Sequence, residues 1–142
     1  MKAFRLPLGR SERELMRELA AELRELIEAG DRDVERLFPA AHPDDPEAAA
    51  EYERLTRSSL AAGRLAALDA VERTLDARTL EPDELEAWTG VLNDLRLVHG
   101  ERLSVTEEMD LERLARRDPS YAVYAWLTWL QATMVDELSS RL

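Results

Sequence analysis

Two apolar stretches in the second half of the chain most constrain what it can fold into. They run from Trp88 to Gly100 (WTGVLNDLRLVHG) and from Tyr121 to Gln131 (YAVYAWLTWLQ), and together they contain all three tryptophans. Within each stretch, apolar side chains recur at the three- and four-residue spacing of one helix face. Neither stretch contains a catalytic constellation. We predict two helices that share one core, formed by Trp88, Leu92, Leu95, Trp126, Leu127 and Leu130.

The rest of the chain continues this helical periodicity. Helices are predicted over residues 11–29, 46–75, 82–100, 104–117 and 119–140, with one or two further helical turns over 31–37. Apolar and other residues alternate before Ser11, which is typical of a short edge strand or an extended arm. The expected fold is all-α: a single domain with an extended arm over 1–10 and a compact bundle of about five helices over 11–142.

Capping signals set the predicted helix ends. A serine followed three residues later by a glutamate fits a capping box. An aspartate before a proline fits an N-cap with proline at the first helical position. A glycine directly after a helical pattern is typical of a helix end. These signals occur at Ser11 with Glu14 and Ser104 with Glu107, at Asp45–Pro46 and Asp118–Pro119, and at Gly30 and Gly100.

The charge balance argues against several kinds of partner. The chain has 19 Lys and Arg against 30 Asp and Glu, a net charge of −11. Nucleic acid and anionic lipid surfaces repel a domain of that charge. The predicted helix after Gly100 begins with the acidic sequence TEEMD, which disfavours a DNA-reading helix-turn-helix. We therefore expect no direct nucleic-acid partner and no membrane partner.

Two absences in the sequence narrow the chemistry and the compartment. There is no cysteine, which excludes disulfides, thiol redox chemistry, cysteine nucleophiles and zinc–thiolate sites. No segment approaches the apolar length of a membrane span, and the N-terminus lacks the apolar region of a signal peptide. We expect a cytoplasmic protein.

One group of residues is a candidate for a metal site. His42, Asp44, Asp45, Glu47 and Glu51 form the densest oxygen-rich cluster. Its spacing is not that of a calcium loop, so a capped and solvated helix start is the favoured interpretation, and no metal or cofactor is expected.

His99 lies on the same helical stripe as Trp88, Leu92 and Leu95. A structural histidine is favoured there, because no nucleophile or substrate pocket is marked in the sequence. An enzyme that uses His99 with Glu101 or Asp94 is the alternative.

Four residues are candidates for binding a protein partner: Trp129, Asn93, Asp94 and Arg96. Trp129 projects away from the apolar stripe of its helix, so either another helix of the chain covers it or it anchors a partner or a homodimer. The other three lie off the main apolar stripe of their helix. Arg96 is expected to pair with a carboxylate of a neighbouring helix, in a network that fixes helix register or presents a polar docking surface.

Three blocks of sequence carry a resemblance to a known family. They are LFPAAHPDDPEAAAEYERLT (37–56), AWTGVLNDLRLVHGERLSVTEE (87–108) and YAVYAWLTWLQ (121–131). Over about residues 37–137, their order and spacing resemble the AosR family of actinobacterial oxidative-stress transcriptional regulators, formerly a domain of unknown function. The resemblance implies a cytoplasmic regulator that contacts a sigma factor or the transcription apparatus. A redox-sensing disulfide is associated with that family name, and this chain has no cysteine to form one.

Three hypotheses for function follow. The leading one is a non-enzymatic regulatory protein that acts through protein–protein contacts in transcription control. The second is an adaptor for protein turnover, because genes of the resembled family tend to lie near that of the ClpS adaptor. The third is the enzyme built around His99. Association with a transcription protein, association with a protease chaperone, or a polar cleft at His99 distinguishes the three.

Overall fold

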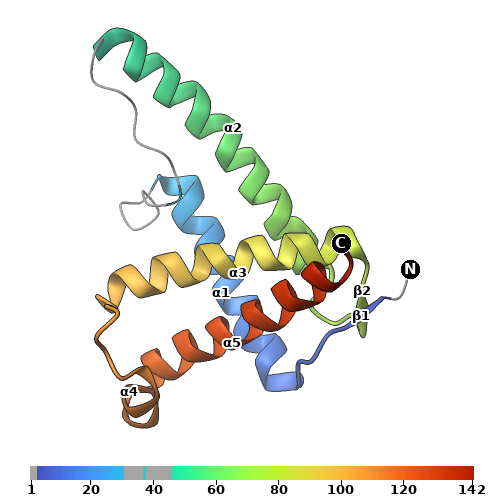
Figure 1. The fold of residues 1–142 in the computed structure, drawn as a ribbon. Helices are drawn as coiled ribbons and strands as arrows, with labels where there is room; N and C mark the ends of the chain where they lie inside the picture. Colours follow the sequence, from blue (N-terminus) through green and yellow to red (C-terminus); the bar gives the residue numbers. More distant parts are fainter. Residues whose placement is uncertain (1–2, 31–36, 38–45) are drawn as a thin grey trace.

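The computed structural model describes residues 3–30, 37 and 46–142, and within them the chain is almost wholly α-helical (Figure 1). Two short strands form an antiparallel sheet, and five helices form the bundle. The all-α prediction is confirmed. In chain order the elements are β1 (Phe4–Arg5), α1 (Arg10–Ala29), α2 (Pro46–Arg73), β2 (Thr79–Leu80), α3 (Pro82–Arg102), α4 (Leu111–Arg117) and α5 (Pro119–Ser140).

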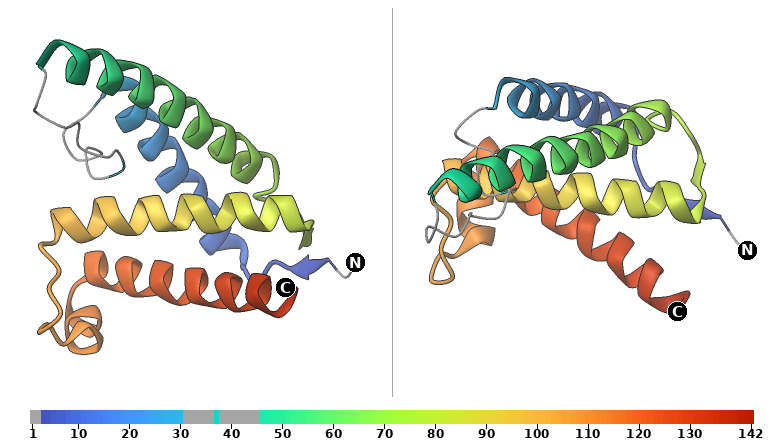
Figure 2. Two further views of the ribbon diagram at one scale, coloured as in Figure 1. Left: turned by 45° about the horizontal axis from the view of Figure 1, so that its top comes forward. Right: turned by 90° about the horizontal axis from the view of Figure 1, so that it is seen from above.

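Helix α3 is the centre of the bundle. It packs against α2 along one side and α5 along another, while α1 packs mainly on α2 and α4 packs on α5. Figure 2 shows α3 and α5 side by side, and α1 crossing α3 on the side away from α5. Helix α5 therefore forms an outer layer of the described structure, with one face toward α3 and another left uncovered.

The predicted core is confirmed. Trp88 has no exposed surface, and its indole nitrogen Nε1 donates a 2.7 Å hydrogen bond to Thr74 Oγ1. Trp126 is partly buried and packs against the same cluster. The remaining members of the predicted core are all buried: Leu92, Leu95, Leu127 and Leu130.

Two of the predicted helix starts are wrong. Helix α1 begins at Arg10, and the backbone N–H of Gly9 donates to Glu12 Oε1 (2.8 Å), so the capping box does not use Ser11 and Glu14. A capping glutamate bonds to the backbone N–H of the cap residue, which glycine also has, and Glu14 is instead paired with Arg17. Helix α4 begins later than predicted, at Leu111 instead of Ser104.

Ser104 has a positive φ of 52°, which is incompatible with an N-cap in extended conformation. The chain turns after it, and Asp110 becomes the cap of α4, accepting a hydrogen bond from the backbone N–H of Arg113 (3.1 Å). The predicted caps at Asp118 and Gly30 are confirmed. The Asp118 carboxylate accepts from the N–H of Ser120 (2.9 Å), and Gly30 is left-handed with φ 65°.

Gly100 does not end its helix, because α3 continues to Arg102. A Cβ at position 100 would lie 3.2 Å from the Cε2 atom of the Tyr124 ring. The glycine therefore allows α5 to approach α3 closely, which is a packing role and not a capping one. The other end error is of the same size: α2 stops at Arg73, two residues before the predicted Leu75.

The N-terminal arm pairs with a strand that the sequence interpretation missed. Phe4 lies opposite Leu80, and the N–H of Leu6 donates to Arg78 O (2.9 Å). Two-residue strands leave too little alternation to be recognised. The side chain of Arg13 fixes this corner, because its guanidinium donates to the backbone oxygens of Leu8, Leu75 and Ala77.

Candidate functional site

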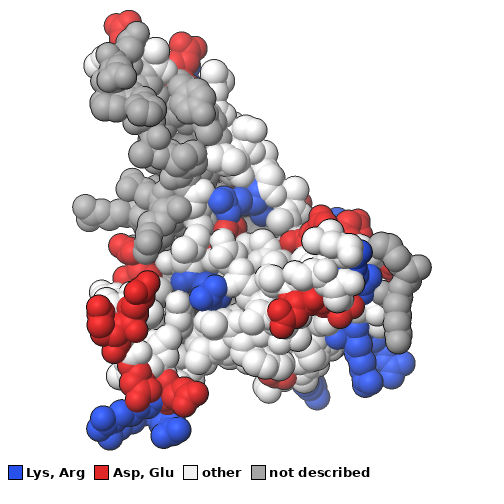
Figure 3. Space-filling view, in the orientation of Figure 1, with Lys and Arg blue, Asp and Glu red and all other residues white. Residues whose placement is uncertain are grey.

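The uncovered face of α5 is the candidate site for a partner. Trp129 lies at its centre with 50% of its surface exposed. No charged residue occurs from Pro119 to Val135, although 35% of the whole chain is charged. Figure 3 shows the corresponding uncharged area over the middle of α5. The expected exposure of Trp129 is confirmed.

Helical periodicity explains why Trp129 points outward. Leu127, Leu130 and Met134 are fully buried on the side of α5 that faces the core. Trp129 lies on the opposite half of the helix, where small residues at spacings of three and four surround it. These neighbours are Ala122, Ala125, Ala132 and Thr133. Their short side chains leave the indole standing above the helix surface.

Acidic residues mark both ends of this uncharged face. Asp118 precedes the first turn of α5, and Asp136 is exposed beyond Trp129. Val135, 40% exposed, adds a second apolar side chain near the C-terminal end. We call this surface the α5 face: Ala122, Ala125, Trp129, Ala132, Thr133 and Val135. It offers apolar contact in its middle, with Asp136 beyond its C-terminal end and Asp118 beside Arg116 and Arg117 at its N-terminal end.

Asn93 and Arg96 lie at the seam between α3 and α5. Arg96 Nε donates to Thr128 Oγ1 (3.0 Å), and its Nη1 donates to the side-chain oxygen of Gln131. Gln131 Nε2 in turn donates to Asn93 Oδ1 (3.3 Å). The carboxylate expected as the partner of Arg96 is therefore replaced by a hydroxyl and an amide. The guanidinium carbon also lies 5.8 Å from the centre of the Tyr124 ring.

Asp94 faces the other neighbour of α3. It is 4% exposed, and its Oδ1 accepts a hydrogen bond from Nη1 of Arg64 on α2. Arg64 Nη2 also donates to Leu37 O (2.7 Å). Burial raises the pKa of Asp94, and the hydrogen bond and charge of Arg64 oppose that shift. The Arg–carboxylate pair between helices exists, but a different arginine forms it.

The four predicted partner-binding residues do not form one surface. Gln131, which holds Arg96 and Asn93, follows Trp129 by two positions, about 160° around a helix of 3.6 residues per turn. Asp94 is turned toward α2. Asn93, Asp94 and Arg96 thus bond α3 to both neighbours, as the register interpretation expects. Trp129 alone of the four belongs to the α5 face.

His99 lies in the contact between α1 and α3. Its neighbours there are mostly apolar, and the packing leaves no space for a small molecule. Burial lowers its pKa, against the opposing charge of Glu22 and together with that of Arg102. Glu101 is exposed, and Asp94 faces α2. The groups proposed for an enzyme are therefore not brought together. The residues around His99 are Leu19, Glu22, Leu23, Leu26, Leu95 and Val98.

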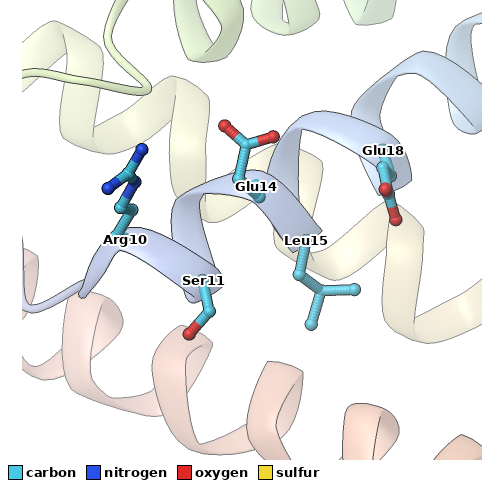
Figure 4. A pocket seen from close by; sticks show the side chains of 5 residues that line it. All are labelled: Arg10, Ser11, Glu14, Leu15 and Glu18. Carbon is cyan, nitrogen blue, oxygen red and sulfur yellow. The ribbon is translucent and has the colours of Figure 1, made fainter.

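Two hollows on the described surface carry no converging catalytic groups. One of about 590 Å³ lies along the first turns of α1, where Ser11 and Leu15 point away from Arg10 and Glu14 (Figure 4). Another, of about 340 Å³, lies between α2 and α3 above the Arg64–Asp94 pair. Within residues 3–30, 37 and 46–142, no three His, Asp or Glu side chains are placed to hold a metal ion.

The oxygen-rich cluster of the sequence is only partly described. His42, Asp44 and Asp45 lie outside the described residues. Glu47 and Glu51 lie in the first turns of α2, where both are exposed. None of the helices described is long and apolar enough to cross a membrane.

Fold and site define an all-α bundle with an uncovered apolar helix face. The chain belongs to the family described as a domain of unknown function, DUF2017, whose family model matches residues 1–138. No curated protein and no solved structure matches the chain significantly.

The sequence predictions named Trp129 but none of the other residues of the α5 face. The angle of Trp129 around its helix predicted that it points away from the core, and the structure shows that it is half-exposed. The signal for the rest was present: the uncharged run from Pro119 to Val135 stands out in a chain so rich in charge. The Arg64–Asp94 pair carried no local signal, because the two residues are 30 positions apart.

Proposed function

We propose that this protein is a non-enzymatic regulatory protein that binds another protein through the α5 face. The observation that carries the proposal is the half-exposed indole of Trp129 in the middle of an uncharged helix surface. Tryptophan is enriched among the residues that dominate binding energy at interfaces. An exposed apolar surface rimmed by polar groups is typical of an interaction site.

Charge specifies the chemistry of the partner. The protein carries a net charge of −11, and the exposed Asp136 follows the α5 face at its C-terminal end, whereas Arg116 and Arg117 lie beside Asp118 at the other end. The matching surface has an apolar centre and a basic rim, such as a helix with arginine or lysine on its flanks. Long-range attraction between the two accelerates their encounter, and the apolar centre contributes most of the affinity.

The resemblance to AosR-type regulators supports a partner in the transcription apparatus. Sigma factors and polymerase subunits contain basic, nucleic-acid-binding surfaces, which fit an acidic regulator. Because the chain has no cysteine, the proposed regulation does not depend on a thiol of its own. Such a regulator acts in the cytoplasm and does not contact DNA directly.

Cross-linked affinity purification from the native cell tests the proposal, with wild-type protein and Trp129→Ala as baits. We expect wild-type protein to recover a sigma factor or polymerase subunit, and Trp129→Ala to lose it. Leu55→Ala is the matched control: Leu55 is 62% exposed on α2, so the variant removes a similar apolar group elsewhere. It should retain the partner.

Three results would contradict the proposal. Recovery of a protease chaperone in place of a transcription protein favours the adaptor hypothesis. A self-association in analytical ultracentrifugation that Trp129→Ala abolishes would assign the α5 face to a second copy of the chain. Equal recovery by wild type and Trp129→Ala would place the docking surface elsewhere. Circular dichroism and the thermal midpoint should be nearly the same for both variants, since neither side chain is core.

A further inference from the structure

A second site lies at the sheet end of the molecule, where two arginines flank one hollow. Arg5 is in β1, directly opposite Thr79 of β2. Arg78 precedes Thr79, and its backbone oxygen is bonded to the N–H of Leu6. The hollow has a volume of about 340 Å³ and is lined by Arg5, Arg78 and Thr79. Two arginine residues and one threonine therefore border a single hollow.

Neither guanidinium is neutralised within the described part of the chain. Arg5 and Arg78 make no ion pair and no side-chain hydrogen bond there. Other arginines of the bundle are held by acidic partners, as Arg24 is by Asp69 and Glu72. In a chain with 30 acidic and 19 basic residues, two adjacent exposed arginines without a carboxylate form a local positive centre.

The backbone beneath this site is fixed from several directions. The two strands pair, and Arg13 donates to Leu75 O (2.6 Å) and Ala77 O (2.8 Å) on the segment that leads into Arg78. Leu6 and Leu80 anchor the sheet in the core, with 4% and 0% exposure. Only the two arginine side chains need to order on binding, which limits the entropy lost.

We propose that Arg5, Arg78 and Thr79 form a binding site for a phosphate dianion, either inorganic phosphate or the phosphate monoester of a small molecule. Each planar guanidinium donates two parallel hydrogen bonds to a pair of oxygens. One such fork already satisfies a carboxylate, whereas two forks and a hydroxyl match a tetrahedral group with three or more acceptor oxygens. Two positive charges also match a dianion better than a monoanion. The site is separate from α5 and does not rest on the proposed partner.

Two-dimensional NMR of the full 142-residue chain tests the site, with amide signals followed during titration at constant ionic strength. Inorganic phosphate and glycerol phosphate are the probes, and acetate is the monoanionic comparison. We expect saturable shifts centred on residues 4–6 and 78–80 with both phosphates, and at least about tenfold weaker binding of acetate. Saturation by inorganic phosphate but not by glycerol phosphate restricts the site to the free ion.

Arg5→Gln and Arg78→Gln should each weaken phosphate binding about tenfold or more, since each removes one charged fork. Arg117→Gln is the matched control, because it makes the same charge change on exposed α4, away from the sheet (Figure 1). It should bind phosphate like the wild type. Non-saturating shifts, acetate binding as tight as phosphate, or an equal loss in Arg117→Gln would overturn the proposal. Unchanged spectra elsewhere in the variants show that the fold is retained.

Discussion

The indole nitrogen of Trp88 donates a 2.7 Å hydrogen bond to the hydroxyl oxygen of Thr74, and both side chains are buried. Thr74 lies just after α2 and Trp88 is in α3, so this bond joins the central helix to the segment that leads to the sheet. Thr74 Oγ1 also bonds to the backbone oxygen of Ala70 (2.7 Å). One hydroxyl therefore satisfies the polar atom of the largest core residue.

Replacing Thr74 with valine should lower the free energy of unfolding by about 1–3 kcal/mol, the penalty of a buried donor left without its partner. Valine keeps the shape of threonine, so the loss reports on the hydrogen bond. Urea unfolding monitored by tryptophan fluorescence measures it. Thr89→Val is the control, because the Thr89 hydroxyl bonds only to the Leu85 oxygen of its own helix. An equal loss in both variants would show that the Trp88 bond contributes nothing.

The two glycines of α3 should respond differently to substitution by alanine. A Cβ on Gly90 meets no atom within 4 Å, so Gly90→Ala should gain about 0.5–1 kcal/mol of stability from the lower flexibility of the unfolded chain. At Gly100 the Cβ lies 3.2 Å from the Tyr124 ring. The ring must shift to make room, and we expect that strain to cancel the gain. Thermal midpoints of both variants check this, and equal stabilisation would contradict the packing role of Gly100.

Trp88, Gly100 and the N-terminal arm show how far the sequence predicts the fold. Helical period and composition predicted the five helices and placed Trp88 in the core, because both depend on residues close in sequence. The role of Gly100 depends on a ring 24 positions away, and the N-terminal arm depends on a strand that only its partner defines. Local signals predicted a glycine stop and left the arm as either a short edge strand or an extended segment. Contacts between distant segments decide both.

At the candidate site, too, some features could be predicted from the sequence and others depend on how the helices pack. The outward direction of Trp129 followed from its own helix, whereas the packing of the other helices, which leaves it 50% exposed, decided that it is not covered. The partners of Arg96 did not follow, because which side chain of α5 meets it depends on the offset between two helices. Gln131 and Thr128 occupy the places where a carboxylate was expected. Arg5 and Arg78 were likewise brought together only by strand pairing.

Breaking the Arg64–Asp94 ion pair should destabilise the fold substantially, although the Arg64 side chain is partly exposed. Arg64→Met keeps the stem of the side chain but leaves the Asp94 carboxylate buried without its cation. Loss of one partner from a buried pair typically costs about 3–5 kcal/mol. We expect a loss toward the lower end, because the Arg64 side chain is 26% exposed and solvent screens the pair. Chemical denaturation at neutral pH measures the change.

A second substitution separates charge from shape at this pair. Arg64→Met with Asp94→Leu removes both charges, so the double variant should recover much of the stability lost by Arg64→Met alone. Arg54→Met is the control, since Arg54 forms only an exposed pair with Glu51 on the same helix. A double variant no more stable than the single one would show that the pair acts through geometry and not through compensated charge.

Stability should fall below about pH 6.5 because of His99. The pKa of His99 is lowered in the folded protein, chiefly by burial in the α1–α3 contact. As the pH drops through 6.5, the unfolded chain takes up a proton at this residue, whereas the folded protein takes it up only at a lower pH. The unfolded state then binds more protons, so the free energy of unfolding decreases with falling pH. His99→Gln removes this proton uptake, so the free energy of unfolding of the variant should decrease less with falling pH. Chemical denaturation of both proteins between pH 5 and pH 8 measures the two free energies of unfolding. If they differ by the same amount at every pH, His99 has the same pKa in the folded and unfolded states.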